Sequence, residues 1–544
     1  MHGLIMDRPL LISSLLEFGA RNHANSEIVS RSVEGPMHRY TLAQSHARTK
    51  QLAKAMARLG VVEGDRIATI AWNGYRHFEL YFAISGMGAI CHTINPRLFH
   101  EQIVYVINHA EDKYVFMDLT FVPLLEALGA HLPKVSGYVI MTDKEHMPET
   151  KLENIQCYED LLAAEDDDYA WPEFDELTAS SLCYTSGTTG NPKGVLYSHR
   201  STVLHTLAIC SAEGPGLNSR VSYLAVVPMF HVNAWGIPYG CALTGAKLVL
   251  PGPRYEGDMI FDLLDDEKVN ITAGVPTIWM MLLAEMRKRG RKPEALETLI
   301  VGGSAFPASM IESFEDEFAV NVHHAWGMTE LSPVGTSGGL LTSMLGLPKE
   351  ERWAVKGKQG RAIWGVEKKI VGEDGAELPH DGVAFGELMV RGPWTASEYY
   401  NDAEATAQSF TEDGWFHTGD VATIDEHGIM QIVDRKKDVI KSAGEWISSI
   451  DLENAAMAHP AIQEAAVIGM PHPKWDERPL LVVVAAEGES PVLEEVNEFL
   501  ADKVAKWWLP DDLMVMDELP HTATGKISKL NLREQLKDYS FPST

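Results

Sequence analysis

The chain contains 544 residues, of which 45% are hydrophobic, 22% are charged and 8% are aromatic, a composition typical of folded globular protein. At this length a single hydrophobic core stops growing, so we expect at least two domains. The formal net charge of −30 repels phosphate backbones and anionic lipid, which argues against nucleic acid as a partner and requires locally placed cations wherever a phosphate binds.

Short apolar runs alternate with helical patterns through the first third of the chain. We predict strands over 66–72, 89–94, 113–117 and 137–141, and helices over 78–86 and 101–109. This alternation is typical of βαβ units and a mainly parallel sheet. A second series of strands, over 222–227, 247–250, 271–274 and 298–302, predicts a second α/β subdomain stacked on the first. The acidic stretch 164–176 is interpreted as a solvated linker.

The pattern changes to β after Gly386, where residues 386–392, 414–425 and 427–435 predict a small β-rich subdomain. A new unit then begins, with helices expected over 450–457 and 494–507 and strands over 464–469, 480–486 and 513–516. The charged run from Arg435 to Asp438 separates the two patterns. We therefore expect an α/β fold with a large N-terminal domain (1–436), made of two stacked α/β subdomains and a small β-rich subdomain, and a small mobile α+β C-terminal domain (437–544).

The five cysteines are widely spaced and lack the paired spacing of zinc or redox sites, so we expect reduced structural thiols. The first residues lack the basic start and apolar run of a secretory signal. The longest stretch without Asp, Glu, Lys or Arg, residues 221–246, is interrupted by prolines, glycines and polar residues, which favours a buried strand and loop over a membrane span. We expect a cytoplasmic protein with no membrane span.

Residues 184–194, with the sequence YTSGTTGNPKG, carry the strongest chemical signal. Small residues let backbone N–H groups turn toward an anion, hydroxyls add donors and Lys193 adds a point charge, so this segment is predicted to grip phosphate. It is not a Walker loop, because Gly190 precedes Lys193 by three residues and no Ser or Thr follows the lysine. An ordinary polar surface loop is the alternative.

The same segment resembles the phosphate-loop signature of the adenylate-forming superfamily, which includes acyl-CoA synthetases, peptide-synthetase adenylation domains and beetle luciferases. The other motifs of that family follow in order over nearly the whole chain: VPMFHVNAW (227–235), GGSAFP (302–307), WGMTE (326–330), GELMVRG (386–392), GWFHTGD (414–420), DRKKDVIKSAGE (434–445) and PHTATGKISK (520–529). The resemblance implies a two-step reaction in which a carboxylate attacks ATP to give acyl-AMP and pyrophosphate, and a thiol then takes the acyl group. It implies ATP, Mg²⁺ and coenzyme A as cofactors, a small-molecule carboxylic acid as substrate, and a homodimer.

The resemblance also implies a nucleotide site. Its expected members are Thr185, Ser186, Gly187, Thr188, Thr189, Lys193, Ala325, Trp326, Gly327, Met328, Thr329, Asp420, Arg435, Lys441 and Gly444. Glu330, with Thr185, is expected to hold Mg²⁺ while substrate phosphates complete the shell. Asp420 is suited to accept both ribose hydroxyls, and the forked, permanently charged Arg435 to bridge ribose and acyl phosphate. Taken singly, these residues are equally compatible with exposed surface or an interdomain salt bridge.

Two lysines of the predicted C-terminal domain match catalytic positions of the family. Lys526 matches the catalytic lysine, and the chemistry favours a cation there because the adenylation transition state gathers negative charge on the α-phosphate and the attacking carboxylate. Lys437 matches the hinge, where backbone rotation would replace Lys526 by the face that bears Lys441 and Gly444.

The acyl pocket is expected to involve residues of three motifs, together with Pro333: His231, Trp235, Gly302, Gly303, Trp326 and Pro333. His231, also a catalytic candidate, heads the family's aromatic gate segment, and core packing is the alternative for each aromatic. Many relatives carry Tyr where this chain has Trp326. Two indoles around one pocket leave less room, which argues against long fatty acids. Within the family the chain resembles bacterial ligases of medium-chain type, and the acid we expect is 3-(methylthio)propanoate.

We therefore predict an acyl-CoA synthetase acting on a short- or medium-chain acid. One rival is an adenylating enzyme that delivers the acyl group to a carrier-protein thiol or to oxygen. Another is a serine hydrolase, because residues 335–339 (GTSGG) fit G-x-S-x-G around Ser337. Pro333 and a run without strand character precede that motif, so we interpret it as a flexible loop. A non-catalytic binding relative is disfavoured because Lys193, Glu330, Asp420, Arg435 and Lys526 occur together.

Overall fold

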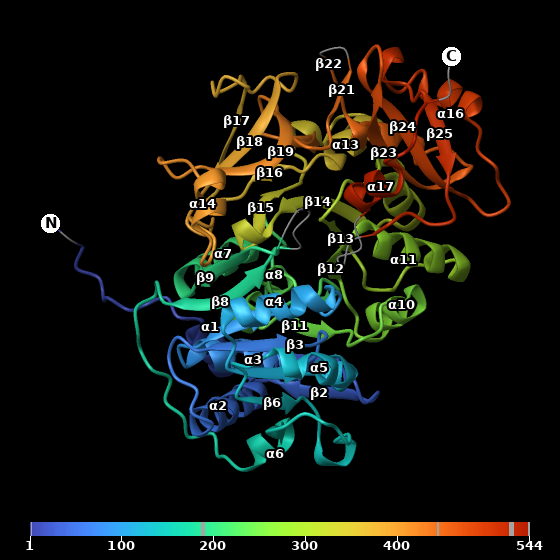
Figure 1. Ribbon diagram of the computed structural model, residues 1–544. Helices are drawn as coiled ribbons and strands as arrows, with labels where there is room; N and C mark the ends of the chain where they lie inside the picture. Colours follow the sequence, from blue (N-terminus) through green and yellow to red (C-terminus); the bar gives the residue numbers. More distant parts are fainter. Residues whose placement is uncertain (2, 186–190, 443–444, 522–526, 542–544) are drawn as a thin grey trace.

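The computed structural model describes residues 1, 3–185, 191–442, 445–521 and 527–541. These residues form four β-sheets, and the two larger ones belong to the N-terminal two thirds of the chain. Figure 1 shows the two smaller sheets, coloured orange and red, at the same end of the molecule. The expected α/β class, with two stacked α/β parts, a small β-rich part and a C-terminal α+β part, is confirmed.

The first large sheet has seven strands in the order β7-β6-β5-β3-β4-β8-β9 and is parallel except for β9. Its strands are β3 (Arg66–Ile70), β4 (Ile90–Thr93), β5 (Tyr114–Met117), β6 (Gly137–Ile140), β7 (Ile155–Cys157), β8 (Ala179–Tyr184) and β9 (Gly194–Ser198). Helices α3 (Tyr75–Gly86) and α4 (His100–Ala110) connect its central strands. Every residue of α3 is buried, so this helix lies in the middle of the molecule rather than on its surface.

The second large sheet has nine strands in the order β16-β15-β14-β13-β12-β10-β11-β1-β2. Its strands are β1 (Glu27–Arg31), β2 (Met37–Thr41), β10 (Ser222–Ala225), β11 (Lys247–Leu250), β12 (Ile271–Gly274), β13 (Thr298–Val301), β14 (Asn321–Gly327), β15 (Val334–Ser337) and β16 (Arg361–Ala362). The β1–β2 hairpin, which the sequence analysis did not predict, joins the edge through parallel pairing of β1 with β11.

The interpretation of residues 335–339 as a flexible loop is wrong. Ser337 ends strand β15, which pairs antiparallel with β14 on one side and β16 on the other. Pairing with a strand on each side overrides the weak local strand pattern. Because Ser337 does not stand at a strand-to-helix turn, the serine-hydrolase alternative loses its structural basis.

The third sheet is four-stranded and antiparallel, with β17 (Glu367–Val371), β18 (Phe385–Arg391), β19 (Phe416–Ile424) and β20 (Met430–Arg435). The fourth contains β21 (Ile440–Ser442), β22 (Glu445–Ile447), β23 (Ile462–His472), β24 (Asp476–Ala485) and β25 (Asp512–Val515), and is flanked by α15 (Ser449–Ala456), α16 (Leu493–Leu500) and α17 (Lys529–Gln535). Four residues, 436–439, join the third sheet to the fourth.

The predicted helix over 494–507 is only half correct, because α16 ends at Leu500. Leu500, Val504 and Trp508 recur at helical spacing and all contact the same core, which explains the prediction. The chain nevertheless turns, since the Arg478 guanidinium donates to the Trp507 carbonyl oxygen at 2.7 Å and to that of Leu509 at 3.0 Å.

Further helices cover the two large sheets: α1 (Ile12–Asn22), α2 (Leu42–Arg58), α5 (Val122–Leu128), α6 (Tyr158–Ala163), α7 (His199–Cys210), α9 (Ile237–Thr244), α10 (Gly257–Asp266), α11 (Pro276–Arg289), α12 (Ala308–Glu312) and α13 (Lys349–Gly357). Helix α14 (Ala403–Ser409) packs against β19 of the third sheet. Helix α2 begins with a capping box, in which Gln44 N–H donates to Thr41 Oγ1 and Thr41 N–H donates to Gln44 Oε1. Among the described residues, no helix combines the length and apolar character needed to cross a bilayer.

The acidic stretch 164–176 follows the surface but is more than a solvated linker. Its carboxylates reach the body, as in the 2.6 Å ion pair of Asp166 with Lys54. Trp171 packs on Gly86, where an added Cβ would lie 2.7 Å from the indole. All five cysteines are free, as expected, and burial raises the pKa of Cys183 to about 11.

Candidate functional site

The antiparallel pair β8–β9 brings together the two ends of the predicted phosphate loop. Thr185 N–H donates to the Lys193 carbonyl oxygen at 2.9 Å, and Lys193 N–H donates to Thr185 Oγ1 at 3.2 Å. The loop residues Ser186, Gly187, Thr188 and Thr189 lie outside the described residues. These two hydrogen bonds join the described ends of the loop at its base.

Tyr399 links Lys193, at the base of the loop, to Glu330. The Lys193 ammonium lies 4.8 Å from the centre of the Tyr399 ring, and the Tyr399 hydroxyl donates to Glu330 Oε1 at 2.6 Å. Burial raises the pKa of the Glu330 carboxyl, while the Tyr399 hydrogen bond and the charges of Arg435 and Lys193 act in the opposite direction. A buried carboxylate near a lysine that is predicted to bind phosphate fits Mg²⁺, which takes one or two carboxylates together with substrate phosphates.

Asp420 and Arg435 face each other across β19 and β20. Arg435 Nε lies 2.8 Å from Asp420 Oδ1, and Trp326 Nε1 donates to Asp420 Oδ2 at 3.0 Å. The carboxylate is 2% exposed, so both of its oxygens are fixed before any ligand arrives. The sequence analysis expected Asp420 and Arg435 to meet a ribose, but it did not foresee that Trp326 orients the carboxylate.

The segment expected to frame the adenine lies at the end of β14. The register shifts between Trp326 and Gly327, where the strand bulges, and Met328 N–H donates to the Pro333 carbonyl oxygen at 3.0 Å. A Cβ on Gly327 would lie 2.2 Å from that carbonyl oxygen, so the approach requires glycine. Ala325, on the same strand, pairs with Ser337 of β15.

Thr329 follows on the same segment and is held by its backbone. Its carbonyl oxygen accepts a hydrogen bond from the Tyr197 hydroxyl at 2.6 Å. Tyr197 belongs to β9, the strand that leaves the phosphate loop. The motif that contains Glu330 is therefore fixed directly to the phosphate-loop hairpin.

His231 lies beside the base of the phosphate loop. It lines a cavity together with Thr185, Tyr184 and Phe230, and the walls are completed by His92, Thr93, Ile94, Asn95, Leu98 and Val106. The structure thus brings His231 to the residue that opens the predicted phosphate loop.

The chain from Val232 to Trp235 forms a left-handed turn. The φ angles of Val232, Asn233, Ala234 and Trp235 are 41°, 53°, 50° and 57°. Left-handed backbone costs non-glycine residues roughly 1–2 kcal/mol each, and a β-branched residue such as Val232 is rare there. Such a turn persists only where surrounding contacts enforce it, and these conformations gather at functional sites.

Each of the two predicted pocket indoles packs on a glycine. A Cβ on Gly302 would lie 2.5 Å from the Trp235 ring, and a Cβ on Gly335 would lie 2.4 Å from the Trp326 ring. Gly303 has a positive φ of 88°, which favours glycine. Trp235 therefore meets Gly302 as expected, whereas the contacts found for Trp326 lie with Gly335 and Asp420.

The C-terminal candidates are only partly described. Lys526 and Gly444 lie outside the described residues. Lys437 follows Arg435 in the connection between the third and fourth sheets, and burial lowers the pKa of its ammonium. Lys441 lies on β21, where its N–H donates to Glu477 Oε2 at 3.0 Å. Among the described residues no cluster of three His, Cys, Asp or Glu side chains is suited to a metal, so Glu330 remains the candidate ligand.

Two functional candidates were missed by sequence reasoning. Tyr399 and Tyr197 each join motifs that are far apart along the chain. Neither stands in a motif of unusual composition, and a tyrosine in a loop or strand is ordinary by itself. Their roles become visible only from their contacts with Glu330 and Thr329.

Comparisons with known proteins show the family of the chain. Residues 16–400 match the AMP-binding enzyme family and residues 451–526 match the AMP-binding enzyme C-terminal domain. The chain is 51% identical to the 3-methylmercaptopropionyl-CoA ligase of Ruegeria lacuscaerulensis over 538 residues, with 99% of both chains covered. It is 50% identical to the medium-chain-fatty-acid–CoA ligase of Ectopseudomonas oleovorans, with 99% and 98% covered.

A solved structure has the same fold. The anthranilate CoA ligase AuaEII in complex with anthranoyl-AMP superimposes with a TM-score of 0.87 at 24% identity, with 98% of both chains covered. The family match over most of the chain and two relatives at about half identity lead to one conclusion. The chain belongs to the AMP-binding enzyme family, the adenylate-forming superfamily that its motifs resemble.

Proposed function

We propose that this enzyme is an ATP-dependent acid–thiol ligase. It activates a short- or medium-chain carboxylic acid as acyl-AMP, releases pyrophosphate and transfers the acyl group to coenzyme A. The observation that carries the proposal is a set of contacts between motifs: Lys193 lies against the Tyr399 ring, and the Tyr399 hydroxyl donates to Glu330. Trp326, in the same motif as Glu330, donates to Asp420, which pairs with Arg435. Two relatives at about half identity are CoA ligases.

The residues divide the work of the first step. Lys193 and the loop backbone hold the ATP phosphates, and Asp420, oriented by Trp326 and Arg435, accepts the ribose hydroxyls. Glu330 and Thr185 would hold Mg²⁺, which supplies positive charge against the phosphate oxygens. Arg435 and Lys526 stabilise the charge that develops as the carboxylate attacks the α-phosphate.

We propose domain rotation between the two steps. The boundary expected at residues 436 and 437 lies within the four-residue connection between β20 and β21. Rotation about Lys437 would withdraw Lys526 and bring the face with Lys441 and Gly444 to the acyl-AMP. A hinge of this kind needs only a few residues that absorb the backbone change.

The substrate we propose is 3-(methylthio)propanoate, as in the relative from Ruegeria lacuscaerulensis. The Trp235 indole packs against Gly302 and offers an aromatic surface for a thioether. His231 and Gly303 lie close to these two residues in the sequence. Sulfur against an aromatic ring edge contributes roughly 0.3–1.5 kcal/mol. A medium-chain fatty acid, the substrate class named for the relative from Ectopseudomonas oleovorans, is the second candidate.

The place of the enzyme is proposed from its chemistry. Five free thiols are typical of a reducing compartment, which supports a cytoplasmic location. We propose a homodimer, since closed two-fold dimers are the commonest oligomers. Sedimentation of the purified chain at two concentrations tests this, and a monomer at both would contradict it.

Pyrophosphate release is the test of the function. The enzyme is incubated with ATP, Mg²⁺ and a panel of acids, with and without free CoA. We expect release with 3-(methylthio)propanoate and butyrate, and acyl-CoA as the product when CoA is present. Acyl-AMP formation without acyl-CoA would instead favour a carrier-protein thiol as acceptor. No pyrophosphate release with any acid would refute the proposal.

A further inference from the structure

A buried asparagine holds the segment that leads from β10 toward the acyl site. Asn73, between β3 and α3, is fully buried. Its Nδ2 donates to the carbonyl oxygens of Ala225 at 2.7 Å and Val227 at 2.8 Å, and its Oδ1 accepts the Met229 N–H at 2.6 Å. One carboxamide therefore fixes three alternate residues of a segment that belongs to the other large sheet.

A tyrosine from helix α3, which begins two residues after Asn73, completes this attachment. Tyr81 lies in α3, is fully buried, and donates its hydroxyl hydrogen to the Met229 carbonyl oxygen. Both backbone polar groups of Met229 are thus satisfied by side chains from one region, Asn73 and Tyr81. Two residues after Met229 comes His231, and the left-handed turn follows.

The left-handed turn has its own anchor on the phosphate-loop strand. Asn233 Nδ2 donates to Ser181 Oγ at 3.0 Å, and the Cys183 thiol donates to Asn233 Oδ1 at 3.5 Å. Both partners lie on β8, which leads directly into Thr185. The segment 225–235 is therefore held at its start by α3 and in its turn by β8.

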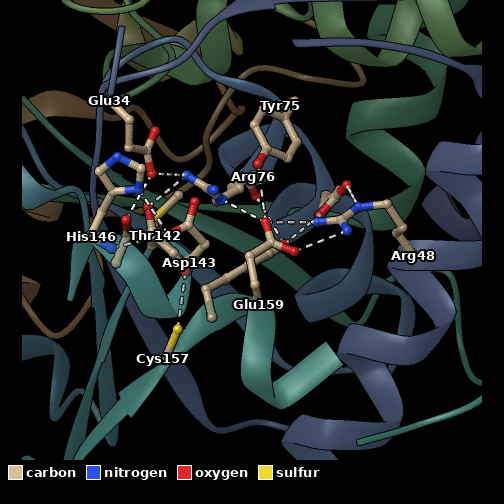
Figure 2. Close-up of polar contacts among 12 residues, drawn as sticks. Glu34, Arg48, Tyr75, Arg76, Thr142, Asp143, His146, Cys157 and Glu159 are labelled. Carbon is tan, nitrogen blue, oxygen red and sulfur yellow. Dashed lines mark hydrogen bonds and ion pairs between the residues drawn. The ribbon is translucent and has the colours of Figure 1, made fainter. Parts of the chain in front are cut away.

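Helix α3 is a rigid base for these contacts. Arg76, near its start, donates to Glu34 Oε1 at 2.7 Å and to Glu159 Oε1 at 2.8 Å, and Figure 2 shows its guanidinium between the two carboxylates. The Tyr75 hydroxyl also donates to Glu159, at 3.0 Å. Ion pairs from other elements thus fix the helix turn that separates Asn73 from Tyr81.

We propose that Asn73 and Tyr81 are positioning residues that decide which acids the enzyme accepts. They fix residues 225–229, and thereby set where the strained turn places Trp235 against Gly302. A left-handed turn of non-glycine residues needs such external restraints, because local backbone preference opposes it. Loosening them lets the indole leave the glycine face and opens room for a longer acyl tail. The inference rests on the proposed function.

The experiment compares three conservative variants of the full-length enzyme. Tyr81→Phe removes one hydroxyl, and Asn73→Ala removes the carboxamide. Thr272→Val is the matched control, since Thr272 is a fully buried hydroxyl that donates to the Leu224 carbonyl oxygen at 2.8 Å, beside the segment but not on it. The readouts are kcat/KM for butyrate and octanoate, KM for ATP, and amide hydrogen exchange of residues 225–236.

We expect Tyr81→Phe and Asn73→Ala to raise the octanoate-to-butyrate ratio of kcat/KM by about tenfold, the discrimination of roughly one methylene in an apolar pocket. The change should arise in KM for the acid, with KM for ATP unchanged, and exchange of residues 225–236 should accelerate. Thr272→Val should keep the wild-type ratio and exchange.

An unchanged ratio in Tyr81→Phe, or an equal change in Thr272→Val, would overturn the inference. If Asn73→Ala fails to fold, Tyr81→Phe decides alone. Failure of the proposed function is seen separately, as no pyrophosphate release by the wild type with any acid. In that case amide exchange of residues 225–236 tests the inference. Unchanged exchange in Tyr81→Phe would refute it.

Discussion

At the scale of single residues, burial and the neighbouring groups shift the pKa of Glu330 in opposite directions. Burial raises the pKa of its carboxyl, and the Tyr399 hydroxyl, Arg435 and Lys193 favour the charged form. Only the charged form is a good ligand for Mg²⁺. The Tyr399 hydroxyl therefore supports the proposed metal-binding role of Glu330, although no motif contains it.

Tyr399→Phe should weaken the use of Mg²⁺. Loss of a hydrogen bond to a charged group costs roughly 1.5–3 kcal/mol, so the Mg²⁺ concentration for half-maximal adenylation should rise by about tenfold or more. A hydrogen bond donated to a carboxylate lowers its pKa, so its removal moves the pKa of Glu330 up. The acid limb of the pH profile should move to higher pH. Pyrophosphate release against Mg²⁺ and pH measures both.

Tyr400→Phe is the control for that variant, because it removes the hydroxyl of the next residue, whose ring packs on His109, whereas the hydroxyl that donates to Glu330 is that of Tyr399. The two variants should differ in Mg²⁺ requirement. Identical profiles for Tyr399→Phe and the wild type would exclude a role of the hydroxyl at Glu330.

Lys526→Ala tests the proposed catalytic lysine. Removing a group that stabilises developing charge typically costs about a hundred- to a thousand-fold in rate, and here the loss should fall on acyl-AMP formation alone. Thioester formation from supplied acyl-AMP and CoA should be largely spared. Measuring the two half-reactions separately decides, and an equal loss in both would refute the assignment.

At the scale of elements, the left-handed turn presents Trp235 to Gly302. An indole buries on the order of 200 Å² and closes volume that a long chain would need. Trp235→Ala should therefore allow longer acyl tails and lower kcat/KM for the small acids. The measurement is kcat/KM for 3-(methylthio)propanoate, butyrate, octanoate and palmitate. Palmitate as the best wild-type substrate would overturn the short pocket.

The connection between β20 and β21 is the second element with a functional prediction. Lys437→Pro fixes φ near −65° at the proposed hinge. Adenylation should remain measurable while transfer to CoA is blocked, because only the second step needs the rotation. Single-turnover assays of each step provide the measurement. Thioester formation at the normal rate would place the hinge elsewhere or remove the need for rotation.

At the scale of the whole molecule, largely buried ion pairs join four elements of the N-terminal domain: α2, α3, α6 and the β1–β2 connection. Arg76 of α3 binds Glu34 from the β1–β2 connection and Glu159 of α6, and Arg48 of α2 also binds Glu159 (Figure 2). Arg48 binds Glu79 of α3 as well. Burial raises the pKa of Glu34 and Glu159, but the arginine charges and hydrogen bonds prevail, so both lie below their ordinary value of 4.5.

Arg76→Met should destabilise the fold strongly at neutral pH. Its side chain is 8% exposed, and removing one partner of a buried ion pair typically costs about 3–5 kcal/mol. Depressed carboxyl pKa values stabilise the fold above pH 4.5 and cease to do so as the pH falls through the folded-state values. The difference between variant and wild type should therefore shrink in acid.

Urea unfolding at pH 7 and pH 4 measures this difference. Arg254→Met is the control, since Arg254 is half exposed and pairs with the exposed Glu256. Equal stability of Arg76→Met and Arg254→Met at pH 7 would contradict the structural role of the cluster.

Local pattern determined much of this protein. The strands of the two large sheets follow from apolar runs between helical patterns, and their predicted positions agree with β3 to β6 and β10 to β13 to within a few residues. Small residues, hydroxyls and a lysine in one short run indicated the phosphate loop. These features depend on residues that are close together along the chain, so the spacing and composition of short segments are enough to predict them.

Only the tertiary structure decided the remaining features. The β1–β2 hairpin joins its sheet through β11, far along the chain, β15 depends on pairing with β14 and β16 on its two sides, and the end of α16 depends on Arg478. Tyr399 meets Glu330 across 69 positions, and Trp326 meets Asp420 across 94. The left-handed turn opposes local preference and exists because Asn73, Tyr81 and β8 hold its surroundings. Contacts between distant segments determine these features, and such contacts have no signature in local composition or spacing.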